Sequence, residues 1–169
     1  KSLRSTACSA TATALAVALA GTHRGGEGAF GVTAFALAHA KLQPAFLQAV
    51  VLGILCNALV CLAIWLTYSA RTTTDRILAI VPPITAFVAA GFEHSIANMY
   101  FVPYAIFVAA LDPDFVAARE LGPQTAALTW IAFLGRNLLP VTIGNIIGGS
   151  VLVSAVYWFA YLRPRGPAR

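Results

Sequence analysis

Four long apolar segments, separated by short polar stretches, set the pattern of this chain. They cover residues 3–21, 46–69, 77–111 and 138–162. About 20 apolar residues are enough for a helix to cross a bilayer. Two shorter apolar pieces, residues 29–40 and 125–134, are expected to lie in the membrane interface, or in the first case to re-enter the membrane. The pattern predicts an all-α integral membrane protein with four spans, in a single membrane domain over residues 1–169.

The third segment is too long for one straight span. A helix of about 35 residues would extend roughly 50 Å, whereas the hydrocarbon core is about 30 Å thick. The segment therefore either tilts steeply or breaks, and Gly91, Glu93, His94 and Ser95 suit a break. We predict two half-helices that meet near residues 91–95. Irregular backbone at membrane depth requires protein or a water-filled cavity around it, so the break implies a pore or a binding site.

The same place carries the polar chemistry of the segment. Glu93 is the only charged residue between positions 77 and 111, and His94 is its titratable neighbour. Ionisable groups inside membrane segments are functional candidates by default. His94 acts either in function or as a structural hydrogen-bond partner at the break, and Glu93 is expected to cap exposed N–H groups there. Three embedded carboxamides either line a pore or bridge helices: Asn57, Asn98 and Asn145.

Composition agrees with a membrane protein, because 59% of the residues are hydrophobic and only 10% are charged. A soluble domain averages about 25% charged residues. The net charge of +5 does not indicate nucleic-acid binding, since the basic residues lie at segment ends.

The three cysteines lack metal-ligand spacing, so we expect no metal and no cofactor. No nucleophile, base and orienting acid can be combined, which argues against an enzyme. His23 and His39 are expected in loops.

The basic residues also predict the orientation of the chain. If the spans alternate in direction, seven basic residues face one side and four face the other. The larger set consists of Lys1, Arg4, Arg71, Arg76, Arg163, Arg165 and Arg169. Basic residues are enriched on the cytoplasmic side of membrane proteins. Both ends of the chain are therefore predicted to be cytoplasmic.

Two other functional classes are compatible with a membrane helix bundle. A haem-binding membrane subunit of a redox complex would need two histidines at membrane depth, and only His94 qualifies. A membrane fragment that binds a partner or stabilises an assembly, without transport of its own, is the other alternative.

Several motifs resemble those of a known family. Residues 92–103, FEHSIANMYFVP, resemble the signature of the formate/nitrite transporter family of anion channels. Lys41, the run LCNALVCLA at residues 55–63 and the run NLLPVTIGNIIGG at residues 137–149 match further family segments in the same order. The correspondence extends from about residue 41 to residue 163.

The resemblance implies an architecture and a function. Family members have six membrane helices in two inverted halves, form aquaporin-like protomers and assemble as homopentamers. The four spans would correspond to the third to sixth helices, so the first two are expected to be missing and the chain to be incomplete at its N-terminus. The implied function is transport of small monovalent anions, most of all formate and then nitrite, across the inner membrane of the cell. The implied partners are the anion, protons and membrane lipid.

The resemblance also suggests roles for individual residues. His94 would exchange a proton with the anion, and the proton would convert formate into the more membrane-permeant formic acid. Lys41 would draw anions into the vestibule and bias protonation near the histidine. Phe87 matches a family position that forms a hydrophobic constriction. A half-helix that begins just after His94 would direct its N-terminal N–H groups and positive dipole end toward the anion.

Overall fold

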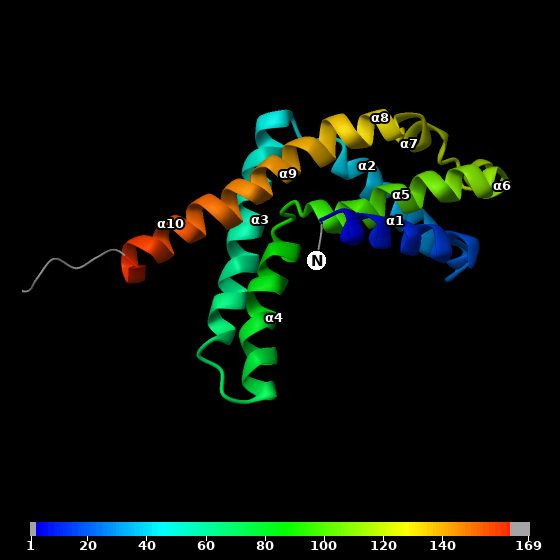
Figure 1. The fold of residues 1–169 in the computed structure, drawn as a ribbon. Coiled ribbons are helices and arrows are strands. Elements are labelled where there is room, and N and C mark those ends of the chain that lie inside the picture. Colours follow the sequence, from blue (N-terminus) through cyan, green and yellow to red (C-terminus); the bar gives the residue numbers. More distant parts are fainter. Residues whose placement is uncertain (1–2, 163–169) are drawn as a thin grey trace, which may run out of the picture. The chain divides into compact units, whose positions relative to one another are not determined.

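The computed structural model describes residues 3–162, which form helices and turns without a strand (Figure 1). The chain divides into two compact units. Unit 1 contains Lys1–Ala49 and His94–Pro140, and unit 2 contains Val50–Glu93 and Val141–Arg169. Along the sequence, one boundary between the units falls between Glu93 and His94, within the expected break.

The helices follow the predicted segments closely at most positions. The longer ones are α1 (Leu3–Leu19), α2 (Ala29–Lys41), α3 (Phe46–Thr67), α4 (Thr73–Ala89) and α5 (Ser95–Leu111). Short elements are the 3₁₀ turn η1 (Thr22–Arg24), α6 (Pro113–Ala118) and α7 (Gly122–Ala127). By length and composition, α3 and the last helix are long and apolar enough to cross a membrane, and most of α1 and all of α5 form shorter apolar helices.

The last helix starts earlier than predicted. It runs without interruption from Trp130 to Leu162, rather than from residue 138. Its parts are α8 (Trp130–Ala132), α9 (Leu139–Ile146), α10 (Ser154–Tyr157) and the π-helical stretches η2 (Phe133–Leu138), η3 (Ile147–Val153) and η4 (Trp158–Leu162). The Thr129 hydroxyl caps the start by accepting a hydrogen bond from the Ala132 N–H at 3.1 Å. The prediction of a separate interfacial segment at residues 125–134 is therefore wrong, because the second half of that range belongs to the last helix.

Small side chains of α1 pack against α5 in unit 1. α1 packs along α5, with Ala14 and Ala18 buried on one face of α1 and Val102 and Ala105 buried on α5. Phe35 of α2 belongs to the same core. In a membrane, where lipid is as apolar as the helix surface, small residues favour helix association because they let backbones approach closely. This packing explains how α1 can be stable with few large side chains.

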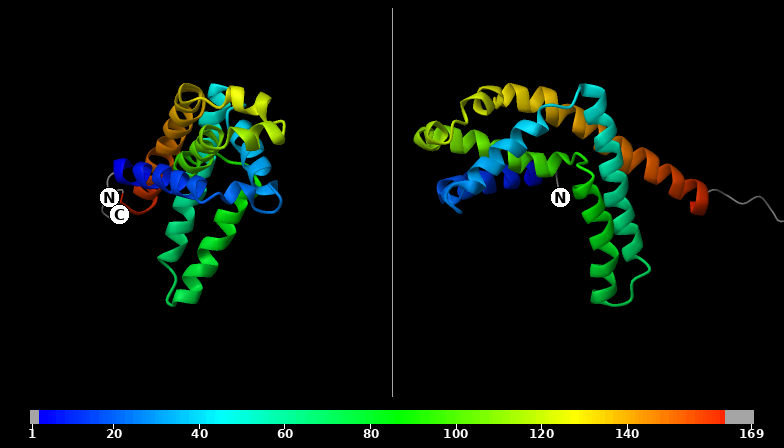
Figure 2. Two further views of the ribbon diagram at one scale, coloured as in Figure 1. Left: turned by 90° about the vertical axis from the view of Figure 1, so that its right-hand side faces the viewer. Right: turned by 180° about the vertical axis from the view of Figure 1, so that it is seen from behind.

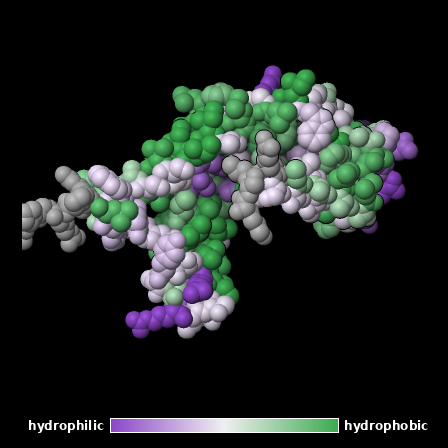
Figure 3. All heavy atoms as spheres, in the orientation of Figure 1, coloured by the Kyte–Doolittle hydropathy of each residue, from purple (hydrophilic) through white to green (hydrophobic). Residues whose placement is uncertain are grey.

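Unit 2 contains a helical hairpin. α4 runs side by side with the part of α3 that belongs to this unit, residues 50–67. A turn joins the two helices, as all three ribbon views show (Figures 1 and 2). Thr72 and Asp75 form a capping box at the start of α4, and these hydrogen bonds from Thr72 lower the pKa of Asp75. Hydrophilic side chains gather at this turn, whereas the helix surfaces are mainly apolar (Figure 3). The turn is thus the hydrophilic end of this hairpin.

Glycines bring the last helix against α3 within unit 2. A Cβ atom at Gly144 would lie 2.2 Å from the Val50 carbonyl oxygen, and one at Gly148 would lie 2.2 Å from that of Ile54. Real Cβ atoms do not approach oxygen that closely. The small residues four apart in the sequence thus permit direct backbone contact between the helices.

Predictions about the chain ends concern residues that lie partly outside the described range. Lys1, Arg163, Arg165 and Arg169 contribute to the predicted orientation and are outside residues 3–162. The orientation stays a prediction.

Candidate functional site at the helix break

The expected break is present, and α4 ends there in a Schellman motif. Gly91 has a left-handed conformation with φ of +67°, and its N–H donates to the Val88 carbonyl at 3.1 Å. The Phe92 N–H donates to the Phe87 carbonyl at 3.0 Å. These two bonds satisfy carbonyls that a helix end would otherwise leave unpaired. The chain can therefore leave the helix here with both of these carbonyls hydrogen-bonded.

His94 begins the second half-helix. It is the N-cap of α5, with extended backbone angles (φ −116°, ψ 117°), and its Nδ1 atom accepts a hydrogen bond from the Ala97 N–H at 3.4 Å. The Asn98 N–H donates to the His94 carbonyl at 3.0 Å. The prediction that a helix begins just after His94 is confirmed. The His94 side chain thus caps this terminus, and the capping role expected for Glu93 stays a prediction.

A polar group in unit 1 joins three elements. The Asn137 Nδ2 atom donates to the main-chain carbonyl of Lys41 at 2.7 Å, and its Oδ1 atom accepts from Asn98 Nδ2 at 2.8 Å. Asn98 and Asn137 are both fully buried. Lys41 is the last residue of α2 and is half-buried. Hydrogen bonds thus connect Lys41, Asn98 and His94 in one series. The link is Asn137, which was not among the predicted site residues.

Asn137 was missed because the sequence pattern placed it just ahead of the last span. The polar pair Arg136 and Asn137 interrupts an apolar run and was taken as its boundary. In the structure both residues lie within η2, where the wide π-helical turns continue the helix past them. Thr129 was the available signal that the last helix begins earlier, since threonine is a favoured N-cap residue.

A second polar group lies in unit 2. The Asn145 Nδ2 atom donates to the Gly53 carbonyl at 2.9 Å and to the Glu93 carbonyl at 3.0 Å. The Asn57 Nδ2 atom donates to the main-chain carbonyl of Asn145 at 2.6 Å. The two carboxamides therefore bridge main chains of α3, the last helix and the break. Glu93 itself is 3% exposed, and Phe87 is a half-buried residue in the last turn of α4.

Sequence reasoning also missed a buried ion pair at the far end of α5. His23 Nε2 lies 2.8 Å from Asp112 Oδ2, which Arg24 also contacts, and Asp112 Oδ1 accepts from the Phe115 N–H at 3.1 Å. The hydrogen bonds from His23 and then Arg24 lower the pKa of Asp112 to about 2. His23 is buried in η1 and His39 lies in α2, so neither is a loop residue. His23 and Asp112 are separated by 89 positions in the sequence, and no periodic pattern indicates this contact.

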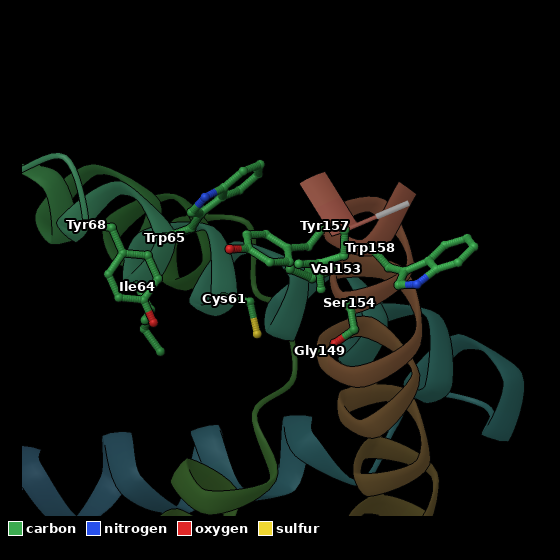
Figure 4. A pocket seen from close by; sticks show the side chains of 10 residues that line it. Cys61, Ile64, Trp65, Tyr68, Gly149, Val153, Ser154, Tyr157 and Trp158 are labelled. Carbon is green, nitrogen blue, oxygen red and sulfur yellow. The ribbon is translucent and has the colours of Figure 1, made fainter. Parts of the chain in front are cut away.

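Unit 2 also has a groove of about 700 Å³ away from the residues at the break (Figure 4). Trp65 of α3 and Tyr157 and Trp158 of the last helix line it, and the rings of Trp65 and Tyr157 meet edge to face with centroids 6.2 Å apart. It includes none of the predicted site residues. Within residues 3–162, no three His, Cys, Asp or Glu side chains gather as a metal site would require.

Comparison with known proteins gives consistent matches. Residues 6–159 match the sequence profile described as formate/nitrite transporter. The chain is 44% identical over 147 residues to the formate channel FocA of Escherichia coli (strain K12), and the match covers 86% of this chain and 52% of that protein. It is 37% identical over 150 residues to the formate channel BtFdhC of Bacillus thuringiensis, with 88% of this chain and 51% of that protein covered.

Solved structures agree with the sequence matches. A pentameric formate channel with formate bound is similar with a TM-score of 0.86 and 40% identity, over 93% of this chain and 62% of that chain. An ion channel of the same family is similar with a TM-score of 0.66 and 34% identity, over 87% and 53% of the two chains. The chain spans about half the length of the curated relatives it matches.

Proposed function

Because the chain belongs to the formate/nitrite transporter family, we propose that it forms part of a membrane channel for small monovalent anions, with formate preferred and nitrite second. Its fold is the all-α membrane channel fold of that family, and it is not an enzyme. The similar proteins described as formate channels support the substrate, and the solved pentameric channel supports a homopentamer. We place the channel in the inner membrane, with both chain ends in the cytoplasm.

The observation that carries this proposal is the interrupted helix with His94 at the start of α5. An anion that leaves water needs hydrogen bonds and positive potential in return. The first N–H groups of α5 and the positive end of its dipole supply both. Broken membrane helices bind anionic groups in this way in other transporters.

The cap also determines which imidazole nitrogen can face an anion. A main-chain N–H can only donate, so Nδ1 of His94 accepts from Ala97 and the proton of the neutral ring lies on Nε2. Neutral His94 can therefore offer its Nε2–H to an anion as a hydrogen-bond donor.

Proton exchange requires a further step at the same ring. The imidazolium carries a proton on Nδ1 as well, which removes the acceptor for the Ala97 N–H. Proton delivery to formate from Nε2 would leave the neutral ring with its proton on Nδ1. Regaining the cap then needs a proton shift to Nε2, so a transport cycle with proton transfer alternates between a capped and an uncapped α5.

Lys41 and Phe87 complete the proposal. The ammonium group of Lys41 would raise the local anion concentration ahead of the histidine. Phe87, seven residues before His94, would form the hydrophobic constriction that favours passage of the neutral acid.

The test is formate uptake into liposomes between pH 5 and pH 8. Two preparations are compared, the chain of 169 residues and the same chain extended by any coding sequence that precedes it in its gene. We expect the extended protein to transport formate and the shorter chain to transport it poorly or not at all. Absence of formate and nitrite uptake by a folded, extended protein contradicts the proposed function.

His94→Asn tests the role of the histidine in the extended protein. Asparagine can still cap a helix, so α5 should form, but it cannot titrate in this range. We expect the pH dependence of uptake to flatten. His39→Asn, at a half-buried histidine of α2, is the matched control and should keep the wild-type profile. An unchanged profile in His94→Asn would rule out proton exchange at this residue.

A further inference from the structure

Asn137 combines complete burial with a position in an irregular helix. Its exposed fraction is 0%, and it lies in the π-helical stretch η2. Wide π-turns within α-helices occur frequently at functional sites. A buried carboxamide is retained at little cost only when both of its ends are hydrogen-bonded. The contacts of Asn137 therefore indicate what it holds in place.

The orientation of the amide follows from its partners. The Lys41 carbonyl can only accept, so the NH₂ group of Asn137 faces it, at 2.7 Å. The Asn137 oxygen then faces Asn98, which must present its own NH₂ group, at 2.8 Å. Aspartate of the same size lacks the donor, and leucine lacks both functions. The position thus needs a side chain that donates toward α2 and accepts from α5.

The two partners link Asn137 to Lys41 and His94, which are two of the three charged or titratable candidates. Lys41 ends α2, and its carbonyl is one of the last four that have no partner within the helix. Asn98 lies in the first turn of α5, and its N–H donates to the His94 carbonyl at 3.0 Å. Three hydrogen bonds therefore connect the main chain of Lys41 to that of His94, and all of them lie within unit 1.

We propose that Asn137 is a positioning residue that holds the main chain of Lys41 in fixed register with His94. This inference rests on the proposed function and deepens it. Lysine carries its charge on a flexible four-carbon stem, so the position of its backbone helps to determine where the ammonium group can meet an anion. The attraction between that charge and the anion depends on their separation. Loss of the anchor should therefore remove most of what Lys41 contributes to anion capture.

The test is a double-mutant cycle in the protein that carries out uptake, reconstituted in liposomes. Asn137→Leu removes both hydrogen bonds at similar volume, and Asn137→Asp removes only the donation to Lys41. Lys41→Met removes the charge. Each variant and the double variants are measured for the KM of formate uptake, normalised to folded oligomer, and for the melting temperature. Gly135→Ala in the same stretch is the control, because its added methyl group meets nothing within 4 Å.

We expect each Asn137 variant to raise the KM about five- to tenfold, and Lys41→Met to add little to either of them. The control should keep the wild-type KM. If the Asn137 variants only lower the melting temperature, or if the effects of Asn137 and Lys41 are additive, the positioning role is overturned. Failure of both Asn137 variants to fold would make the residue a folding determinant and also overturn it. A wild-type protein that folds but takes up no formate overturns the proposed function, and the inference with it.

Discussion

The Asn145 side chain donates a hydrogen bond to the main-chain carbonyl of Glu93 at 3.0 Å. The same nitrogen donates to the Gly53 carbonyl of α3 at 2.9 Å. A carboxamide NH₂ group has two hydrogens, so one side chain on the last helix can hold both the break and the neighbouring helix. The irregular backbone at the break thus has a partner within unit 2.

Asn145→Leu should destabilise the protein strongly. It removes the hydrogen bond to the buried Glu93 carbonyl and the additional hydrogen bond to the Gly53 carbonyl, which lies inside the α3 helix, at a net cost of about 0.5–1.5 kcal/mol each. Unfolding by heat or denaturant in detergent measures the loss. Ser150→Ala, at an exposed polar residue of the same helix, is the control and should stay within about 0.5 kcal/mol of wild type. Equal stability of Asn145→Leu and wild type would show that these two hydrogen bonds contribute nothing.

Gly148→Ala should prevent close packing of the last helix on α3. The new methyl group would lie 2.2 Å from the Ile54 carbonyl oxygen, which belongs to the backbone and cannot rotate away. Overpacking of this kind typically costs about 1–3 kcal/mol and sometimes more. We expect a lower melting temperature and less monodisperse protein in detergent.

Gly135→Ala is the matched control for that substitution. Its Cβ would meet nothing within 4 Å, and alanine is favoured over glycine in a helix by about 0.5–1 kcal/mol. It should keep or raise the melting temperature. If Gly148→Ala behaves in the same way, the helices do not approach as closely as the structure indicates.

The break and its two half-helices could be predicted from the sequence because they depend on local properties. The segment was too long for one span, and Gly91 and His94 fit poorly into a lipid-facing helix. The start of the last helix could not be placed, because Arg136 and Asn137 resemble a boundary unless the wide turns of η2 are known. Hydrophobic periodicity says nothing about such turns.

The residue pairs that organise the site could not be predicted, for a different reason. Asn137 and Lys41 are 96 residues apart, and Asn145 and Glu93 are 52 residues apart. These contacts depend on how helices pack, which a single sequence does not record. Asn145 was a candidate because it is a carboxamide within an apolar segment, but its hydrogen bond to the break could not be predicted.

Gly91→Ala should weaken the end of α4 without a steric clash. A Cβ at Gly91 meets nothing within 4 Å, so the penalty comes only from its left-handed φ of +67°. That conformation costs other residues about 1–2 kcal/mol. Gly91→Asn should cost less, because asparagine tolerates this region better. Melting temperatures should follow the order glycine, asparagine, alanine, and any other order would contradict the left-handed turn.

Asp112→Asn should change how the stability of the protein depends on pH between about pH 4 and pH 2. Folding lowers the pKa of Asp112 from its ordinary value of 3.8 to about 2, because His23 and Arg24 hydrogen-bond to the carboxylate. The stability that these contacts provide is therefore fully present above about pH 4 and is lost as the pH falls toward 2. Asparagine does not titrate, so the variant should be less stable at neutral pH and lose less between pH 4 and pH 2. Asp114→Asn makes the same charge change at an exposed neighbour and should follow the wild-type curve. Parallel acid-unfolding curves for wild type and Asp112→Asn would show that the ion pair does not contribute.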